Sequence, residues 1–399
     1  MRKLTLFAAA MAISTLLALP ASALEHTFGG YWRTRAFTQK DFSGDDGESK
    51  DLTQVDTRTR LYYTAKLNDN LKLVNKFEFD AVWGDNDLGD LGTDGKVFEI
   101  KNSYADFDWM DLNFKVGLQG LVLQRGFVMD GDFAGAVVTY RNGPWSLPLI
   151  WIKVDEGHVD FKGRKNANDF DYDSYVINPG YVINDNMTVK GLLGYSHQDE
   201  TETDLYFVGV DFDATFESAK VWFTANYQTG DFKDQDVDAY LVAAGGTWFL
   251  DSFDIHGQAF YASGDDDPAD GDVEGFMDVG AQSYYWSEIM GFGLFDSQAS
   301  AGSPDEKVTN IMAFNMGVGY KPSERLKLMA DLWYAEHAED VNGEDELGVE
   351  VDLRATYQLV ENLNLDVVAA YLFAGDATSL AGKNDEDPFE IGTRLSLSF

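Results

Sequence analysis

Two pairs of basic residues near the start of the chain have the same spacing. Arg33 and Arg35 form the first pair, and Arg58 and Arg60 form the second. In an extended strand, residues two positions apart point to the same face, so each pair presents two guanidinium groups side by side. Guanidinium groups bind carboxylates and phosphates through paired hydrogen bonds. These four residues are therefore candidates for an anion-binding wall.

Other charged residues follow the same alternation. The further basic candidates are Lys72, Lys76, Arg354 and Arg394, and the acidic candidates are Asp56, Glu78, Asp80, Asp331, Glu350, Asp352 and Asp366. Two interpretations are open. Opposed charges across a constriction would orient dipolar solutes and disfavour apolar ones. Alternatively, the charges form ion pairs between strands and select nothing.

Residues for catalysis are scattered. The five histidines stand one at a time along the chain. His256 shares a face with Asp254, and Ser196 adjoins His197, but neither arrangement contains a nucleophile, a base and an orienting group. The sequence predicts no enzyme, and a barrel enzyme would have to depend on His256 or Ser196.

The elements that position these charges are amphipathic strands. Residues 54–67 and 71–83 alternate between an apolar and a charged face, and the turn Asn68-Asp69-Asn70 joins them. Asn and Asp tolerate the left-handed backbone that such turns require. This pattern predicts an antiparallel hairpin with one apolar and one charged side.

The same arrangement continues to the last residue. Eight tight turns alternate with nine longer connections rich in Gly and Asp, which predicts eighteen strands, with sixteen as the alternative count. Phe389 to Phe399 alternate once more, with Arg394 on the polar side. An even number of strands lets this last strand pair with the first, so that no edge is left open.

Composition narrows the class of protein. Residues 1–23 have a basic start, an apolar core and an Ala-Ser-Ala end, which predicts a secretory signal peptide, with residues 24–399 as a single barrel domain. No cysteine is present, so a disulfide framework is excluded. A net charge of −38 argues against nucleic acid as a partner. Aromatic residues make up 14% of the chain, too many for a disordered acidic protein.

Alternation alone does not distinguish a soluble β protein from a transmembrane barrel. Charges occupy the polar face at nearly every position, and aromatics such as Tyr62, Trp83 and Trp109 stand near strand ends, as in a membrane-interface girdle. Short turns alternate with long connections, as periplasmic turns and extracellular loops do. The sequence therefore predicts an all-β transmembrane antiparallel barrel in the outer membrane of a Gram-negative bacterium.

Several segments resemble known families. The segments are Arg58-Thr59-Arg60-Leu61, Phe77-Glu78-Phe79, Val116-Gly117-Leu118-Gln119 and the closing strand that ends in Phe399. Together they resemble Gram-negative outer-membrane porins, most closely the homotrimeric porins of sulfate-reducing and related bacteria. The R-x-R and V-G-x-Q patterns are also similar to the alginate-export barrels. The porin resemblance implies that Phe399 belongs to the signal read by the barrel-assembly machinery.

These features predict a porin for passive diffusion of ions and small hydrophilic solutes. The expected partners are outer-membrane lipid, lipopolysaccharide, the barrel-assembly machinery and two further copies of the chain in a homotrimer. The alternative is a selective channel for an anionic solute or an acidic polysaccharide, with the wall around Arg33, Arg35, Arg58 and Arg60 as its track.

The connection between residues 264 and 307 is too long for a simple turn. Either it folds into the mouth and narrows the pore with its aromatics on the inner wall, or it caps the rim or packs on a neighbouring subunit. Acidic clusters at Asp45-Asp46, Asp265 to Asp267 and Glu344 to Glu346 offer oxygen ligands for Ca²⁺ or Mg²⁺. They lack EF-hand spacing, so an acidic mouth that attracts cations is the preferred interpretation, and no cofactor is expected.

Overall fold

The computed structural model describes residues 24–45, 50–84, 97–157, 171–267, 269–379 and 386–399. The predicted signal peptide lies outside these residues. The described chain is built almost entirely of strands, with two short 3₁₀ helices, η1 (Gln124–Gly126) and η2 (Asp376–Thr378). The strands are β1 (Glu25–Lys40), β2 (Leu52–Asn68), β3 (Leu71–Val82), β4 (Val97–Trp109), β5 (Leu112–Leu123), β6 (Met129–Asn142), β7 (Trp145–Glu156), β8 (Asp171–Ile177), β9 (Gly180–Asn184), β10 (Met187–Gln198), β11 (Thr203–Thr215), β12 (Ala219–Phe232), β13 (Gln235–Leu250), β14 (Phe253–Ala262), β15 (Asp272–Val273), β16 (Ile311–Ser323), β17 (Leu326–Val341), β18 (Glu344–Val360), β19 (Leu363–Ala374) and β20 (Phe389–Ser398).

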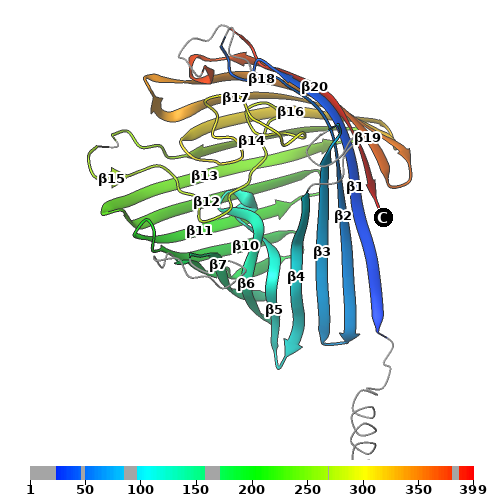
Figure 1. The fold of residues 1–399 in the computed structure, drawn as a ribbon, viewed down its shortest axis with the longest axis vertical. Helices are drawn as coiled ribbons and strands as arrows, with labels where there is room; N and C mark the ends of the chain where they lie inside the picture. Colours follow the sequence, from blue (N-terminus) through cyan, green and yellow to red (C-terminus); the bar gives the residue numbers. More distant parts are fainter. Residues whose placement is uncertain (1–23, 46–49, 85–96, 158–170, 268, 380–385) are drawn as a thin grey trace, which may run out of the picture.

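The strands close into an antiparallel barrel. β15 belongs to a connection, and β8 and β9 are one strand interrupted at Asn178 and Pro179, so the barrel has eighteen strands. β1 pairs with β2 on one side and with β20 on the other, and Figure 1 shows blue β1 beside red β20. The predicted strand number and closure are confirmed.

Pro148, which made the strand count uncertain, lies in β7 opposite Thr139. On its other side, Leu149 pairs with Ile177 and Ser146 pairs with Gly180, so Pro148 stands at the interruption between β8 and β9. Proline has no N–H to give to a ladder. The interruption therefore falls where the neighbouring strand has no donor to offer.

Side chains alternate between the inside and the outside of the barrel. In β16, Ile311, Ala313 and Asn315 are buried, while Phe314 and Met316 are among the exposed apolar side chains of the outer surface. An apolar outer band of this kind is what a barrel presents to lipid. Among the described residues, no helix is long and apolar enough to cross a membrane.

The inner face is not polar throughout, contrary to the simple assignment of polar residues to the lumen. Small and apolar side chains also face inward on several strands, among them Leu205, Phe207, Ala239, Leu241, Phe260, Ala313 and Trp333. They are buried because two chain segments fill this side of the lumen. The first is the η1 segment, residues 124–128, and the second is the inner loop, residues 263–310, which connects β14 to β16.

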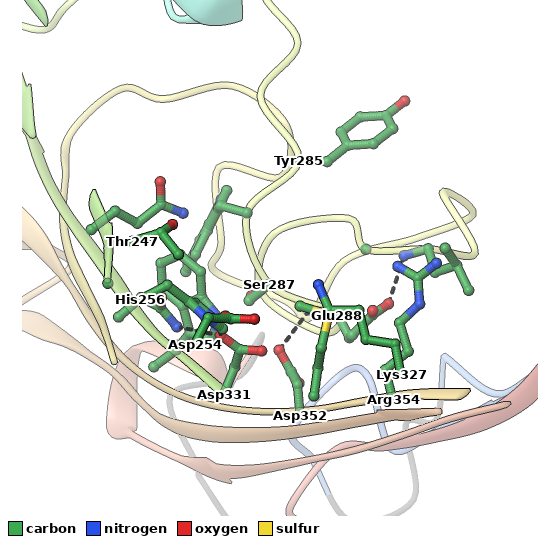
Figure 2. A pocket seen from close by; sticks show the side chains of 18 of the residues that line it. Thr247, Asp254, His256, Tyr285, Ser287, Glu288, Lys327, Asp331, Asp352 and Arg354 are labelled. Atoms are coloured by element: carbon green, nitrogen blue, oxygen red, sulfur yellow. Dashed lines mark hydrogen bonds and ion pairs between the residues drawn. The ribbon is translucent and has the colours of Figure 1, made fainter. Parts of the chain in front are cut away.

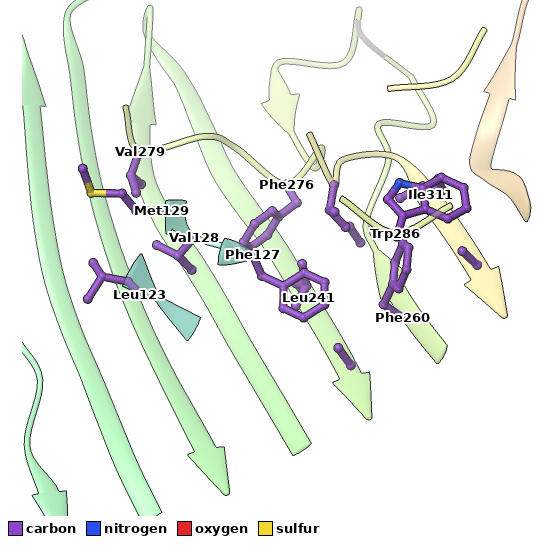
Figure 3. Packing of buried hydrophobic residues seen from close by; sticks show 14 of the residues in the cluster. Leu123, Phe127, Val128, Met129, Leu241, Phe260, Phe276, Val279, Trp286 and Ile311 are labelled. Atoms are coloured by element: carbon purple, nitrogen blue, oxygen red, sulfur yellow. The ribbon is translucent and has the colours of Figure 1, made fainter. Parts of the chain in front are cut away.

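The two segments pack on each other and on the wall (Figure 3). Phe127 of the η1 segment stacks on Tyr284 of the inner loop, with ring centroids 3.9 Å apart. Trp286 of the loop contacts Phe260 and Trp333 of the wall, with ring centroids 5.5 and 5.1 Å apart. A fully buried side chain of this size contributes about 1.5–3 kcal/mol, so this packing holds the loop firmly inside the barrel. Of the two predicted positions for the long connection, the structure has the inward one.

Candidate functional site

The described residues enclose two neighbouring cavities inside the barrel. The larger has a volume of about 1060 Å³ and is lined mainly by β1 to β6, and the smaller, of about 760 Å³, is lined mainly by β12 to β20. Both are lined by Arg33 and Arg394 of the wall and by Tyr285 and Asp296 of the inner loop. These four residues, called the constriction below, mark where the cavities adjoin.

Two wall carboxylates each support two arginines. Glu78 lies 3.5 Å from Arg58 Nε and forms a closer ion pair with Arg60. The Glu78 side chain is only 3% exposed, whereas that of Arg60 is 27% exposed. Both side chains line the larger cavity, and the guanidinium group of Arg60 is the more exposed of the two.

Asp366 has the same role on the other side of the closing strand. It pairs with Arg354 at 2.8 Å and with Arg394 at 3.0 Å, and it accepts a hydrogen bond of 2.6 Å from the Thr356 hydroxyl. Its side chain is 2% exposed, against 29% for Arg354 and 19% for Arg394. Sharing one buried carboxylate between two guanidinium groups leaves a local excess of positive charge toward the cavities.

The first basic pair meets the inner loop. Arg35 binds Asp56 through Nε at 2.9 Å and through Nη2 at 2.7 Å, and both residues are buried. Arg33 Nη2 donates to Asp296 at 3.1 and 3.3 Å, and Arg35 Nη1 also contacts Asp296. Arg58 Nη1 lies 3.9 Å from the same carboxylate. Three wall arginines therefore converge on one carboxylate of the loop.

Lysines extend the cationic wall. Lys76 and Lys101 line the larger cavity beside Arg60. Lys101 pairs with Asp132 at 2.8 Å, whereas Lys76 forms no ion pair within 4.0 Å among the described residues. Tyr62, which the sequence placed in the interface girdle, pairs with Lys76 across β2 and β3 and also lines this cavity.

Glu350 anchors the inner loop and does not line a cavity. Its carboxylate accepts hydrogen bonds from Ile289 N at 2.7 Å, Met290 N at 2.9 Å and the Ser287 hydroxyl at 3.0 Å. The side chain is fully buried. The prediction that Glu350 lines the pore is therefore wrong. Alternation shows that the side chain points inward, but it does not show that the inner loop covers it.

The smaller cavity contains two further groups of acids (Figure 2). His256 bonds Asp254 at 2.9 Å and Asp331 at 2.8 Å. Next to them, Asp352, the cross-strand partner of Asp331, accepts a hydrogen bond of 3.3 Å from Glu288 N. Burial raises the pKa of the Glu288 carboxyl above its ordinary value. Tyr285 points away from both groups in Figure 2, and burial raises its pKa to about 12.

The remaining predicted residues lie as follows. Asp80 pairs with Arg58 at 2.7 Å and lines the larger cavity. Lys72 lies 3.9 Å from Asp106 and lines neither cavity. Across the described residues, no three His, Asp or Glu side chains are placed to hold a metal ion. Asp46 lies outside the described residues, and the preferred interpretation, an acidic mouth with no cofactor, stays a prediction, as does its alternative of a Ca²⁺ or Mg²⁺ ion bound by the loops.

Comparison with known sequences identifies the family. Residues 133–388 match the profile of the family described as alginate export, and this segment is more than half of the 399 residues. The chain belongs to the alginate export family. Of the two resemblances found in the sequence, this is the one that the profile supports. A search of curated proteins found no match.

Solved structures share the fold of this alginate export family member. OccAB4 of Acinetobacter baumannii aligns over 95% of this chain and 99% of its own, with 12% identity and a TM-score of 0.63. OccK11 (OpdR) of Pseudomonas aeruginosa covers 94% and 96%, with 14% identity and a TM-score of 0.59. The outer membrane protein OprD of Pseudomonas aeruginosa covers 94% of each chain, with 11% identity and a TM-score of 0.58. The family member is a bacterial outer-membrane β-barrel, as its sequence predicted.

Sequence reasoning predicted an inward loop with aromatics such as Tyr285 on the inner wall as one of two alternatives, but it missed Asp296. No periodicity in this connection indicates which of its side chains meet the arginines of the wall. Lys101 was also missed. Its inward position does not follow from the alternation of side chains, because Lys76 pairs with Asn102 and a register shift follows that pair. Bulges of this kind move a neighbouring residue to the other face.

Proposed function

We propose that this alginate export family member is an outer-membrane channel that selects anionic solutes. The observation that carries the proposal is the arrangement of Arg354 with Arg394 on one buried carboxylate, Asp366, and of Arg60 on the buried Glu78, whereas Arg58 has Asp80 as its own partner. The carboxylates are shielded and the guanidinium groups are exposed, so a solute in the cavities meets the cations first. A cavity of low dielectric strengthens that interaction relative to water.

The strongly negative chain does not argue against this proposal. Net charge acts mainly on the outer surfaces and is screened within about 8–10 Å at physiological salt, whereas charges in a narrow cavity are screened much less. Several acids of the larger cavity lie near strand ends that adjoin long connections, such as Glu99 in β4 and Asp130 in β6. The cations near the constriction would therefore dominate selection.

The family description names alginate, an acidic polysaccharide, and this supports an anionic cargo for the present chain. Free diffusion of small solutes, assembly as a homotrimer, contact with lipopolysaccharide and recognition of Phe399 by the barrel-assembly machinery stay predictions. A channel with no selectivity would result if every wall charge were fully neutralised by its partner.

Reversal potentials across a planar bilayer in a KCl gradient test the proposal. The wild-type channel is expected to prefer chloride, and the double variant Arg60→Gln/Lys76→Gln should lose most of that preference. Lys72→Gln is the matched control, because it removes an inward cation that lines neither cavity. A wild-type channel that prefers potassium, or a double variant that matches Lys72→Gln, would contradict the proposal.

A further inference from the structure

We propose that Arg33 is the carboxylate-binding group of the constriction and that Asp296 is its built-in occupant, which a solute carboxylate displaces. The inference rests on the proposed anionic cargo and adds the residue that binds it. It also gives the inner loop a role in the exchange.

Arg33 differs from its neighbours in its counter-ions. Asp296 is its ion-pair partner among the described residues. By contrast, Arg35 keeps Asp56 as a second partner, and Arg58 keeps Asp80 and Glu78. If Asp296 moves away, Arg33 is the one of these three arginines left with no carboxylate among the described residues. A buried charge without a partner is unfavourable, so this position would take up a new anion.

The Asp296 carboxylate fills only half of the guanidinium fork. Both of its oxygens contact the same nitrogen, Arg33 Nη2, at 3.1 and 3.3 Å. Arg33 Nε is buried and has no hydrogen-bond partner in the described structure. The stronger arrangement places one carboxylate oxygen on Nε and the other on Nη2. A free carboxylate can take that position, because it is not tethered to a loop.

The backbone at Asp296 is strained. Its φ of 33° lies in the left-handed region that favours glycine, and Phe292 shares that region with a φ of 70°. Residues held in such conformations persist only where surrounding contacts impose them. Here the contacts with Arg33 and Arg35 compensate for the strain, so release of the carboxylate also releases strain.

The loop is fixed on both sides of this residue. Phe295 is fully buried and stacks on Phe37, with ring centroids 4.7 Å apart. Earlier in the loop, the three donors on Glu350 hold residues 287–290, and after Asp296, Ala301 N donates to the Phe42 carbonyl at 2.8 Å. The exchange therefore needs a movement of the Asp296 side chain and its immediate backbone, and the rest of the loop stays docked. Since Asp296 lines both cavities, the displaced carboxylate can turn into either.

Block of the chloride current by gluconate, a hydrophilic monocarboxylate, tests the exchange in planar bilayers, with glucose as the neutral control solute. Asp296→Asn should lower the half-blocking gluconate concentration about tenfold and leave the effect of glucose unchanged. The matched control is Asp80→Asn, which removes another carboxylate of the larger cavity that pairs with a wall arginine. It should change the half-blocking concentration less than twofold.

Two further variants make the test specific. The double variant Arg33→Gln/Asp296→Asn should lose the tighter gluconate block of Asp296→Asn. Asp296→Glu keeps the charge, so its half-blocking gluconate concentration should equal that of the wild type. Equal gluconate block in Asp296→Asn and Asp80→Asn, or a gain that persists without Arg33, would overturn the inference. An Arg33-dependent gain in a channel whose wild type prefers potassium would support the inference and contradict the proposed function. A wild-type channel that prefers chloride, together with an Asp296→Asn variant that gluconate blocks no better than the wild type, would support the proposed function and contradict this inference.

Discussion

The backbones of Gly30 and Phe399 exchange two hydrogen bonds, from Gly30 N to the Phe399 carbonyl at 2.8 Å and from Phe399 N to the Gly30 carbonyl at 3.1 Å. They extend the pairing of β1 with β20 to the last residue. A Cβ added to Gly30 would lie 2.5 Å from Cζ of the Phe399 ring and 2.6 Å from the Arg60 carbonyl oxygen. Glycine lets the ring lie on the seam where the barrel closes.

Gly30→Val should impair closure of the barrel. The Phe399 ring can move, but the Arg60 carbonyl belongs to the neighbouring strand and cannot, so overpacking is expected to cost about 1–3 kcal/mol. The fraction of folded barrel is measured by its shift in migration on gels with and without heating. Gly275→Val is the control, because no atom lies within 4 Å of a Cβ at that position. Equal folded fractions would show that the seam tolerates the side chain.

Asp366 should couple Arg354 and Arg394 energetically. Either Arg354→Gln or Arg394→Gln leaves the carboxylate one guanidinium partner and the Thr356 hydroxyl. The double variant leaves a buried carboxylate with no cation, which costs about 3–5 kcal/mol and exceeds the sum of the single effects.

The free energy of unfolding in urea measures this coupling. Adding Asp366→Asn to the double variant should recover most of the lost stability, because the unpaired charge is then gone. If the double variant loses only the sum of what the two single variants lose, or if adding Asp366→Asn recovers no stability, the two arginines act independently.

Glu350→Gln should loosen the inner loop. The carboxylate accepts three hydrogen bonds from residues 287–290, and an amide replaces one acceptor oxygen with an NH₂ group. At least one loop donor is then left without an acceptor, which costs about 1–3 kcal/mol. We expect larger fluctuations of single-channel current. Glu99→Gln, at the surface of the larger cavity, is the control, and equal current noise in the two variants would contradict the anchoring role.

The sequence predicts the wall of this barrel well and its interior poorly. Strand number, closure and the inward position of Arg33, Arg60 and Arg394 follow from the period of two and from turn chemistry, which are local properties. The interior depends on which inward positions the loop covers. Glu350 and Arg354 are four residues apart on the same face of β18, yet one anchors the loop and the other lines a cavity.

The family assignment favours the selective channel over the general porin, and the sequence alone did not. Composition and turn pattern describe every outer-membrane barrel, so they favoured a general porin. The pairing of two arginines on one buried carboxylate depends on cross-strand register, as between Arg60 and Glu78 or between Arg394 and Asp366. Register is visible in the structure, and it is what favours a selective channel.

Docking of the inner loop should weaken as the pH rises, through Glu288. Burial raises the pKa of this carboxyl above its ordinary value of 4.5, so the docked loop favours the protonated form. Below that value the acid is protonated whether the loop is docked or free, and the stabilisation is complete. As the pH rises through the raised pKa, the docked loop must either bury a carboxylate or release it. Docking then loses at most about 1.4 kcal/mol per pH unit.

Glu288→Gln stays neutral and keeps an acceptor for Leu294 N, so its current fluctuations should not change between about pH 5 and pH 8, whereas those of the wild type increase. Glu306→Gln, another loop carboxyl that lines a cavity, should respond as the wild type does, and a pH response that survives in Glu288→Gln would assign the effect to a different group.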